Sequence, residues 1–347
     1  MFEAVQTLDD VVTRASGEIV GRSRAMASPI LIRLPYRQHS GDATTETETE
    51  TETESDDEAE RLTDRVRQML AGFHDFERVC TRFDPDSALS RINAAPSRWH
   101  RVPPVLFDAI RAARQAYRTT EGSFDPRVLE ELLALGYDDS LRFGDDTTVE
   151  VRRAPRTFRS RGTWNPRLVR AFGAVHLRDD AIDLGGLGKG IAVGRCATEL
   201  AQDRRDFLID AGGDCYCAGQ SAEGTKWRVG VEDAFGGPDP IAVLEVSDQA
   251  VATSSIRLRH WRVGESQVHH LIDPATRRPG GKGLKSVTVV APDPVWAEVW
   301  AKVLFLSGRD RIAEKAHEQR LQALWIDDRG EVGASAALGA TMIWRRT

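Results

Sequence analysis

One glycine-rich segment limits the possible folds of this chain more than any other stretch. Asp183-Leu-Gly-Gly-Leu-Gly-Lys-Gly190 runs directly into an apolar stretch that ends near Leu200. The spacing predicts a strand that ends at Leu184, a glycine turn, and a helix that begins at about Leu187. The apolar positions of this helix recur at helical intervals, at Ile191, Val193, Ala197 and Leu200.

The predicted turn has the chemistry of a phosphate site. A helix N-terminus offers unpaired backbone N–H groups and the positive end of the helix dipole, and Lys189 adds a full charge. The segment is not a Walker loop, because no Ser or Thr follows Lys189, and its glycine order differs from the dinucleotide GxGxxG motif. A tight strand-to-helix turn with a solvated lysine would give the same pattern, so the turn alone leaves both interpretations open.

Composition narrows the class of protein. The 347 residues are 41% hydrophobic, which is sufficient for one large or two modest cores. A formal net charge of −6 argues against a nucleic-acid-binding surface. The four cysteines have no CxxC or zinc-site spacing, so buried free thiols are expected at Cys80, Cys196, Cys215 and Cys217.

The ends and the low-complexity segments set the expected domain limits. The first thirty residues carry no apolar signal segment, and the chain has no apolar run long enough to span a membrane, so a cytoplasmic protein without membrane insertion is expected. Residues 1–25 are predicted to form a weakly helical lead-in to a single domain at 26–346. Within it, the acidic Thr/Glu segment 40–60 is predicted to be a disordered loop, and 138–172 a variable surface loop.

Local periodicity predicts the regular elements. Helices are expected near 59–79, 103–120, 127–135, 294–306 and 309–319. Strands are expected at 30–34, 207–219 with a glycine corner, 227–232, 241–246, 249–255, 286–291, 321–326 and 341–344. Because short turns separate the strands between 207 and 255, the sheet is predicted to be a largely antiparallel meander.

Two adjacent histidines lie on a short predicted strand, Val268-His-His-Leu-Ile-Asp-Pro-Ala-Thr276. Successive strand residues point to opposite faces, so His269 and His270 are expected to face opposite sides. Only one of them can then share a face with a functional site. A single strand histidine that merely packs in the core or on the surface would fit the sequence equally well.

Seven segments in this order resemble the ApbE-type flavin transferases, the FAD:protein FMN transferases. They are Arg82-Phe-Asp-Pro-Asp-Ser-Ala-Leu-Ser-Arg-Ile-Asn93, Gly122-Ser-Phe-Asp-Pro126, Asp183–Gly190, Ala211-Gly-Gly-Asp214, Val251-Ala-Thr-Ser-Ser255, His270-Leu-Ile-Asp-Pro274 and Ser286-Val-Thr-Val-Val-Ala-Pro292. The resemblance extends from Met26 to about Gly308. Each segment alone is common, but seven in register are a specific signal.

The resemblance implies both a fold and an activity. The fold would be an α+β unit of two closely packed lobes, with a largely antiparallel or mixed sheet flanked by helices. The activity would be cleavage of FAD and transfer of FMN, through a phosphoester, to a Thr or Ser of a target flavoprotein, with release of AMP. An FAD pyrophosphatase that yields FMN and AMP, and a non-catalytic FAD-binding protein, are the alternatives.

The resemblance also implies site residues, position by position. His270 would be the catalytic base, and His269 would face away. The expected FAD-binding residues are Met26, Phe83, Ser123, Phe124, Asp125, Asp183, Lys189 and Ile272.

Two departures from the family pattern affect the expected chemistry. Met26-Ala-Ser stands where the family typically has Met-Gly-Thr, and Ala297-Glu-Val-Trp-Ala-Lys302 replaces Ala-Asp-x-x-Ala-Thr. In the family, the Asp and Thr of that helix bind magnesium with a backbone carbonyl beside the glycine turn. The metal positions that carry over here are Gly186, Glu298 and Ala301.

Lys302 makes this magnesium site doubtful, because an ammonium group has no acceptor for a metal. Either a metal binds in an altered geometry through Glu298, Asp214 or Asp273, or the Lys302 ammonium is itself catalytic and neutralises the pyrophosphate. The second interpretation is favoured, and it predicts FAD binding or activity that survives chelation.

Overall fold

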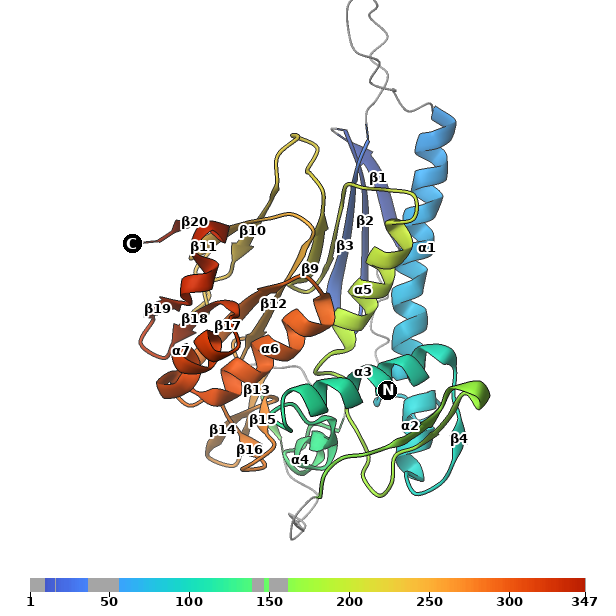
Figure 1. Cartoon of the computed structure of the whole chain (residues 1–347), viewed down its shortest axis with the longest axis vertical. Coiled ribbons are helices and arrows are strands. Elements are labelled where there is room, and N and C mark those ends of the chain that lie inside the picture. The colour runs from blue at the N-terminus through green and yellow to red at the C-terminus, as the bar shows by residue number, and fades with distance from the viewer. Residues whose placement is uncertain (1–9, 16, 37–55, 139–146, 150–161, 347) are drawn as a thin grey trace, which may run out of the picture.

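A nine-stranded antiparallel sheet forms the centre of the protein (Figure 1). The computed structural model describes residues 10–15, 17–36, 56–138, 147–149 and 162–346. The strand order is β1-β2-β3-β8-β9-β12-β17-β18-β19, and each neighbouring pair is antiparallel. Helices flank the sheet, so the predicted α+β class with a largely antiparallel sheet is confirmed.

The first three strands correct the expected helical lead-in. Residues 11–25 form β1 (Val11–Ala15) and β2 (Glu18–Ala25), and β2 pairs with β3 (Ser28–Pro35). The β2–β3 turn consists of Met26 and Ala27, with φ values of 53° and 52°. A two-residue turn in which both φ values are positive matches the right-handed twist of the two strands that it connects. The polar residues of β2 leave no clear alternation of apolar and polar positions, so the sequence alone does not indicate a strand here.

Three helices cover one face of the sheet (Figure 1). They are α1 (Asp56–Cys80), α5 (Gly188–Leu200) and α6 (Pro294–Ser307). Gly21 of β2 permits the close approach of α1, since a Cβ there would collide with Val66. Asp293 accepts a hydrogen bond from the backbone N of Trp296 and Pro294 follows it, so the sequence itself starts α6.

A second, three-stranded sheet covers the other face. It has the order β10-β11-β20, with β10 at Trp227–Val231, β11 at Ala242–Val246 and β20 at Met342–Arg345. Alternation along β8 (Phe207–Ala211) shows the two layers: Ile209 packs toward the helices, and Leu208 toward the second sheet. The central part of the main sheet, which includes β8, is therefore buried on both faces, and this explains the apolar runs of its strands.

The remaining central strands and helices lie close to the predicted positions. The strands are β9 (Asp214–Ala218), β12 (Gln249–Ser255), β17 (Leu284–Ala291) and β18 (Gln322–Asp327), with β19 (Val332–Ala334) unpredicted. The helices are α3 (Pro104–Thr119), α4 (Leu129–Ala134) and α7 (Arg309–Glu318). The structure also contains α2 (Ala88–Ala94) and short 3₁₀ helices at Pro126–Val128 and Ala336–Thr341.

Three small sheets of two or three short strands lie near the lower end of the main sheet in Figure 1. They are β4 (His100–Arg101) with β7 (Ala174–His176) and β6 (Arg167–Val169), β13 (His260–Val263) with β14 (Ser266–His269) and β5 (Thr148–Val149), and β15 (Ile272–Asp273) with β16 (Arg278–Pro279).

The two predicted loops are only partly described. Residues 56–60 of the acidic segment belong to α1, and the rest of 40–60 lies outside the described residues. The segment 138–172 contains β5, β6 and a 3₁₀ turn at Arg170–Phe172, and its residues 139–146 and 150–161 lie outside the description. Among the helices that are described, none has both the length and the apolar character needed to cross a bilayer.

The predicted strand before the glycine turn does not form. Asn93 of α2 instead bonds both polar backbone groups of Ile182: its Nδ2 donates to Ile182 O at 2.8 Å, and its Oδ1 accepts from Ile182 N at 2.9 Å. The backbone N of Asp183 donates to Pro126 O at 2.7 Å. These contacts satisfy the buried backbone without a neighbouring strand, so the segment stays extended but outside the sheets.

Candidate active site

The glycine turn is held by two carboxylates from opposite sides. Asp183 Oδ1 accepts from the backbone N of Gly185 at 2.6 Å. From α6, Glu298 Oε2 accepts from the backbone N of Gly190 at 2.7 Å, and Glu298 is almost fully buried. The N-cap residue of α5, Leu187, has no capping side chain, so the positive end of this helix faces the turn.

Two lysines bring positive charge to this turn. Lys189 Nζ lies 2.5 Å from Asp214 Oδ2, and Asp214 Oδ1 accepts from the backbone N of Thr253 at 2.9 Å. Lys302 of α6 reaches across to Gly186, where a Cβ would lie only 2.6 Å from Lys302 Nζ. One ammonium group therefore lies directly against the turn, and a second, from the first turn of α5, pairs with Asp214.

The proton affinities of this cluster are strongly perturbed. Burial, followed by the negative charge of Asp214, raises the pKa of Glu298 to about 7, and the charges of Lys189 and Lys302 oppose this rise. Burial lowers the pKa of Lys302, against the opposing attraction of Glu298 and Asp183. Buried groups with perturbed proton affinities are typical of functional sites.

Arg82 is a site residue that sequence reasoning assigned no role. Its Nε lies 2.6 Å from Asp183 Oδ2, and its Cζ lies over the rings of Phe83 and Tyr137, at 4.1 Å and 4.4 Å from their centroids. Arg82 stands at the start of the first of the seven segments of the resemblance, but nothing in that segment predicts a partner 101 positions further along the chain. Phe83, an expected FAD-binding residue, is 39% exposed.

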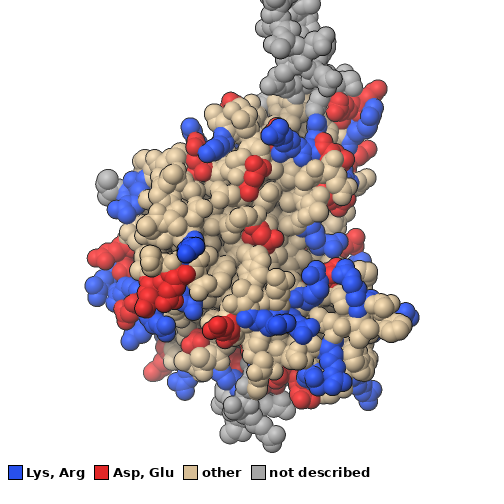
Figure 2. Space-filling model, in the orientation of Figure 1, with Lys and Arg blue, Asp and Glu red and all other residues tan. Residues whose placement is uncertain are grey.

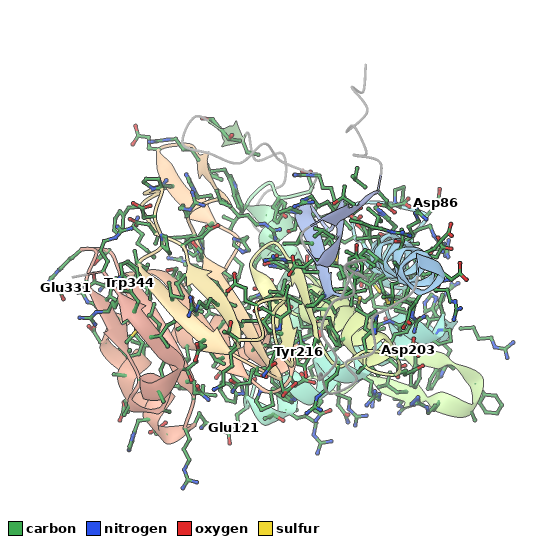
Figure 3. The ribbon with its side chains drawn as sticks, turned by 90° about the horizontal axis from the view of Figure 1, so that it is seen from above. Asp86, Glu121, Asp203, Tyr216, Glu331 and Trp344 are labelled. Atoms are coloured by element: carbon green, nitrogen blue, oxygen red, sulfur yellow. The ribbon has the colours of Figure 1, made fainter. Side chains whose placement is uncertain are left out.

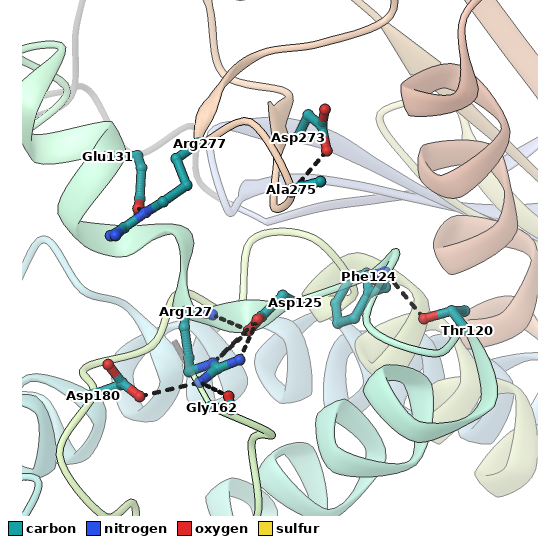
Figure 4. A network of polar contacts seen from close by, with 10 residues as sticks. All are labelled: Thr120, Phe124, Asp125, Arg127, Glu131, Gly162, Asp180, Asp273, Ala275 and Arg277. Atoms are coloured by element: carbon teal, nitrogen blue, oxygen red, sulfur yellow. Dashed lines mark hydrogen bonds and ion pairs between the residues drawn. The ribbon is translucent and has the colours of Figure 1, made fainter. Parts of the chain in front are cut away.

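The Ser123-Phe124-Asp125 turn is built around an internal ion pair (Figure 4). Both oxygens of Asp125 accept from Arg127, at 3.0 Å from Nε and 2.7 Å from Nη2, and both side chains are buried. The buried Phe124 ring lies against Gly186, which connects this turn to the glycine turn. Ser123 is half-buried and lines a cavity of about 660 Å³ together with Asp125 and residues 273–275.

The two histidines have different neighbours. The ring of His269, at the end of β14, meets Phe305 of α6 edge-on, and burial lowers its pKa to about 4. His270 Nδ1 lies 3.2 Å from the backbone O of Arg259. Burial, and then the positive charges of Arg259 and Lys302, hold the pKa of His270 well below its usual value.

Met26 and Ile272 lie at other parts of the predicted site. Met26 is half-buried in the β2–β3 turn, beside the glycine corner between β8 and β9, where a Cβ on Gly212 would come within 2.7 Å of the Ser28 side chain. Ile272 is buried in a small core with Tyr137 and Trp261, so it supports the ring against which Arg82 packs.

The residues present do not fit a magnesium ion beside Gly186. Magnesium requires a near-octahedral set of oxygen ligands. Here Glu298 already bonds Gly190, Ala301 is fully buried in an apolar core, and the Lys302 ammonium lies next to Gly186. Among the described residues, no three His, Cys, Asp or Glu side chains are placed to hold a metal ion.

The two other carboxylates that could bind a metal, Asp214 and Asp273, already have partners within the protein. Asp214 pairs with Lys189, and Asp273 accepts from the backbone N of Ala275 at 2.9 Å and from Thr276 Oγ1 at 3.0 Å.

A second cavity, of about 750 Å³, lies away from the predicted residues. It is lined by the C-terminal half of α5, by β8 and β9, and by the start of α6; Figure 3 labels Asp203 and Tyr216 from its lining. None of the predicted site residues lines it. Acidic and basic side chains are interspersed over the face shown in Figure 2, so attraction of an anionic ligand depends on the local cations of the site.

Comparisons with known proteins identify the family of this chain. A model of the ApbE family matches residues 44–325. The FAD:protein FMN transferase of Klebsiella pneumoniae (strain 342) is 26% identical over 282 residues, which cover 79% of each chain. That of Haemophilus influenzae is 25% identical over 279 residues, which cover 76% of this chain and 79% of the relative.

Solved structures show the same fold. The ApbE protein of Thermotoga maritima superposes with a TM-score of 0.75 at 23% identity, and covers 95% of this chain and 100% of its own. The flavin transferase ApbE of Vibrio cholerae has a TM-score of 0.69 at 19% identity, with the same two coverages. The family match spans most of the chain, and the chain therefore belongs to the ApbE family.

Proposed function

We propose that this protein is an FAD:protein FMN transferase, which moves FMN from FAD to a Thr or Ser hydroxyl of a target flavoprotein. The observation that carries the proposal is the glycine turn at the start of α5, flanked by Lys189 and Lys302. Backbone N–H groups and two ammonium groups suit the FAD pyrophosphate. The relatives that match this chain are named for the same activity.

The reaction exchanges the phosphoanhydride bond between the two phosphates of FAD for a phosphoester bond to the acceptor. The acceptor hydroxyl oxygen attacks the phosphorus on the FMN side of the pyrophosphate, the bond from that phosphorus to the bridging oxygen breaks, and AMP leaves with that oxygen. Negative charge builds on the phosphoryl oxygens in this step, and the cations beside the turn stabilise it.

His270 is suited to remove the proton of the hydroxyl. Its low pKa keeps the imidazole neutral at pH 7, so a ring nitrogen can accept a proton. Because Nδ1 faces the backbone O of Arg259, Nδ1 carries the hydrogen and Nε2 is the accepting atom.

Lys302 supplies the charge that magnesium supplies elsewhere in the family. Its ammonium lies against Gly186, and its partly buried position strengthens its interaction with a phosphate oxygen. An ammonium group gives no Lewis-acid activation, so the protein would be a slower enzyme than a metal-dependent relative.

Mass spectrometry tests the function directly. A candidate flavoprotein is incubated with this protein and FAD, with and without EDTA, and a mass gain equal to FMN is expected in both cases. Chromatography of a parallel incubation without acceptor detects free FMN and AMP. Rapid release of both products without any acceptor modification would show a pyrophosphatase, and intact FAD throughout would show a binding protein.

A further inference from the structure

We infer that Arg82 is a further FAD-binding residue: its guanidinium donates a hydrogen bond to a phosphate oxygen of FAD, and Asp183 positions it for this contact. The inference rests on the proposed function, since it takes FAD as the ligand. Asp183, which the resemblance implies to be an FAD-binding residue, would then act by positioning Arg82 and not by contacting FAD itself.

Arg82 is fixed in one orientation. Its side chain is only 6% exposed, and its Nε lies 2.6 Å from Asp183 Oδ2. The rings of Phe83 and Tyr137 lie over the guanidinium, and aromatic contacts of this kind hold a cation without using its N–H groups. The N–H groups of the guanidinium point outward in its own plane, so the aromatic contacts leave them available as hydrogen-bond donors.

One donor on that edge has no partner. Arg82 Nη2 is buried and makes no hydrogen bond to any described residue. A buried N–H group without an acceptor is costly, and native proteins satisfy nearly all such groups. An acceptor brought by a ligand would satisfy Nη2, whereas a structural role would be complete with Asp183 alone.

The position of this donor indicates a phosphate oxygen. Asp183, which holds Arg82, also accepts from Gly185 in the glycine turn, so the guanidinium edge is anchored at the turn that Lys302 reaches from the other side. A planar guanidinium matches the geometry of phosphate oxygens and forms strong charge-assisted hydrogen bonds with them.

Binding measurements with the full chain test the inference. Affinities for FAD and for ADP, which carries a pyrophosphate but no flavin, are measured for the wild type and for Arg82→Met, Arg82→Lys and Asp183→Asn. Arg78→Met is the matched control, because Arg78 is 70% exposed at the end of α1. Circular dichroism confirms folding, and Arg82→Lys keeps a positive charge beside Asp183 if Arg82→Met is unstable.

Arg82→Met is expected to weaken the binding of both FAD and ADP by about 10- to 100-fold, Arg82→Lys by less, and Arg78→Met not at all. Asp183→Asn is expected to weaken both ligands in the wild type but to add little in the Arg82→Met background, because it acts through Arg82.

Unchanged FAD affinity in folded Arg82→Met and Arg82→Lys would refute the inference and leave the transferase proposal intact. Loss of FAD affinity with unchanged ADP affinity would also refute it, since the contact would then be to the flavin. A wild-type protein that binds no FAD would overturn both.

Discussion

The ammonium of Lys302 lies against Gly186, so close that a Cβ at residue 186 would be 2.6 Å from Lys302 Nζ and 3.0 Å from the Phe124 ring. The absence of a side chain at 186 therefore makes room for a cation that comes from α6. Gly186 has no left-handed backbone that would otherwise require glycine. Space, and not backbone conformation, explains the glycine at this position.

This contact predicts the effect of Gly186→Ala. The new methyl group would displace the flexible end of Lys302, at a cost of about 1 kcal/mol or less in the free energy of unfolding. FMN transfer is expected to fall by about 10-fold or more, because the ammonium leaves the phosphate position. Gly194→Ala, in the middle of α5, is the control: its Cβ would meet only ordinary contacts, at 3.8 Å from Pro294, and helix propensity should stabilise it.

Removal of the Lys302 charge should cost more than removal of metal ions. Lys302→Met is expected to lower the rate of FMN transfer by about 100-fold, whereas EDTA leaves the wild-type rate unchanged. Lys282→Met, at an exposed position, is the control for loss of a lysine charge. Complete inhibition by EDTA together with normal activity of Lys302→Thr would contradict the role assigned to Lys302.

Glu298 should make stability depend on pH in a defined direction. Its pKa is about 7 in the folded protein, against an ordinary value of 4.5, so the folded state holds a proton that the unfolded state has released between these values. The free energy of unfolding therefore falls as pH rises through this window. Glu298→Gln keeps an acceptor for Gly190 but has no such proton to lose.

Denaturant unfolding of both proteins at several pH values measures this effect. The stability of Glu298→Gln relative to the wild type should increase from pH 4.5 to about 7 and level off above it. The comparison isolates Glu298 from the histidines, which both proteins share. Glu265→Gln, at an exposed position, controls for the loss of one carboxylate; a difference that does not change with pH would contradict the assignment.

Ala27→Gly should stabilise the protein. Ala27 has a φ of 52° in the β2–β3 turn, a left-handed conformation that costs an L-residue more than it costs glycine. After the larger chain entropy of glycine is subtracted, a gain of about 0.5–1 kcal/mol in the free energy of unfolding is expected. Ala112→Gly, inside α3, should have the opposite sign, and thermal unfolding of the two variants checks both.

Local sequence predicted much of the fold. Strands with apolar runs, the helices with clear spacing and the glycine corner at Gly212–Gly213 were recognised, because these elements are encoded by neighbouring residues. The prediction of a helical lead-in is wrong for β1 and β2, because the polar side chains of β2 have no clear period of two. The seven segments of the resemblance identified the family, which the comparisons confirm.

The structure decided which of these residues meet. Asn93 bonds the backbone of Ile182 in place of a neighbouring strand. Asp183 pairs with Arg82, and Lys302 lies against Gly186. The two residues of each contact are about 90 positions or more apart in the sequence. No local pattern encodes such contacts, because they depend on how α1, α5 and α6 pack on one face of the sheet. The sequence by itself predicted a glycine turn and a following helix that suit a phosphate, and only tertiary packing decided which charged side chains surround that turn.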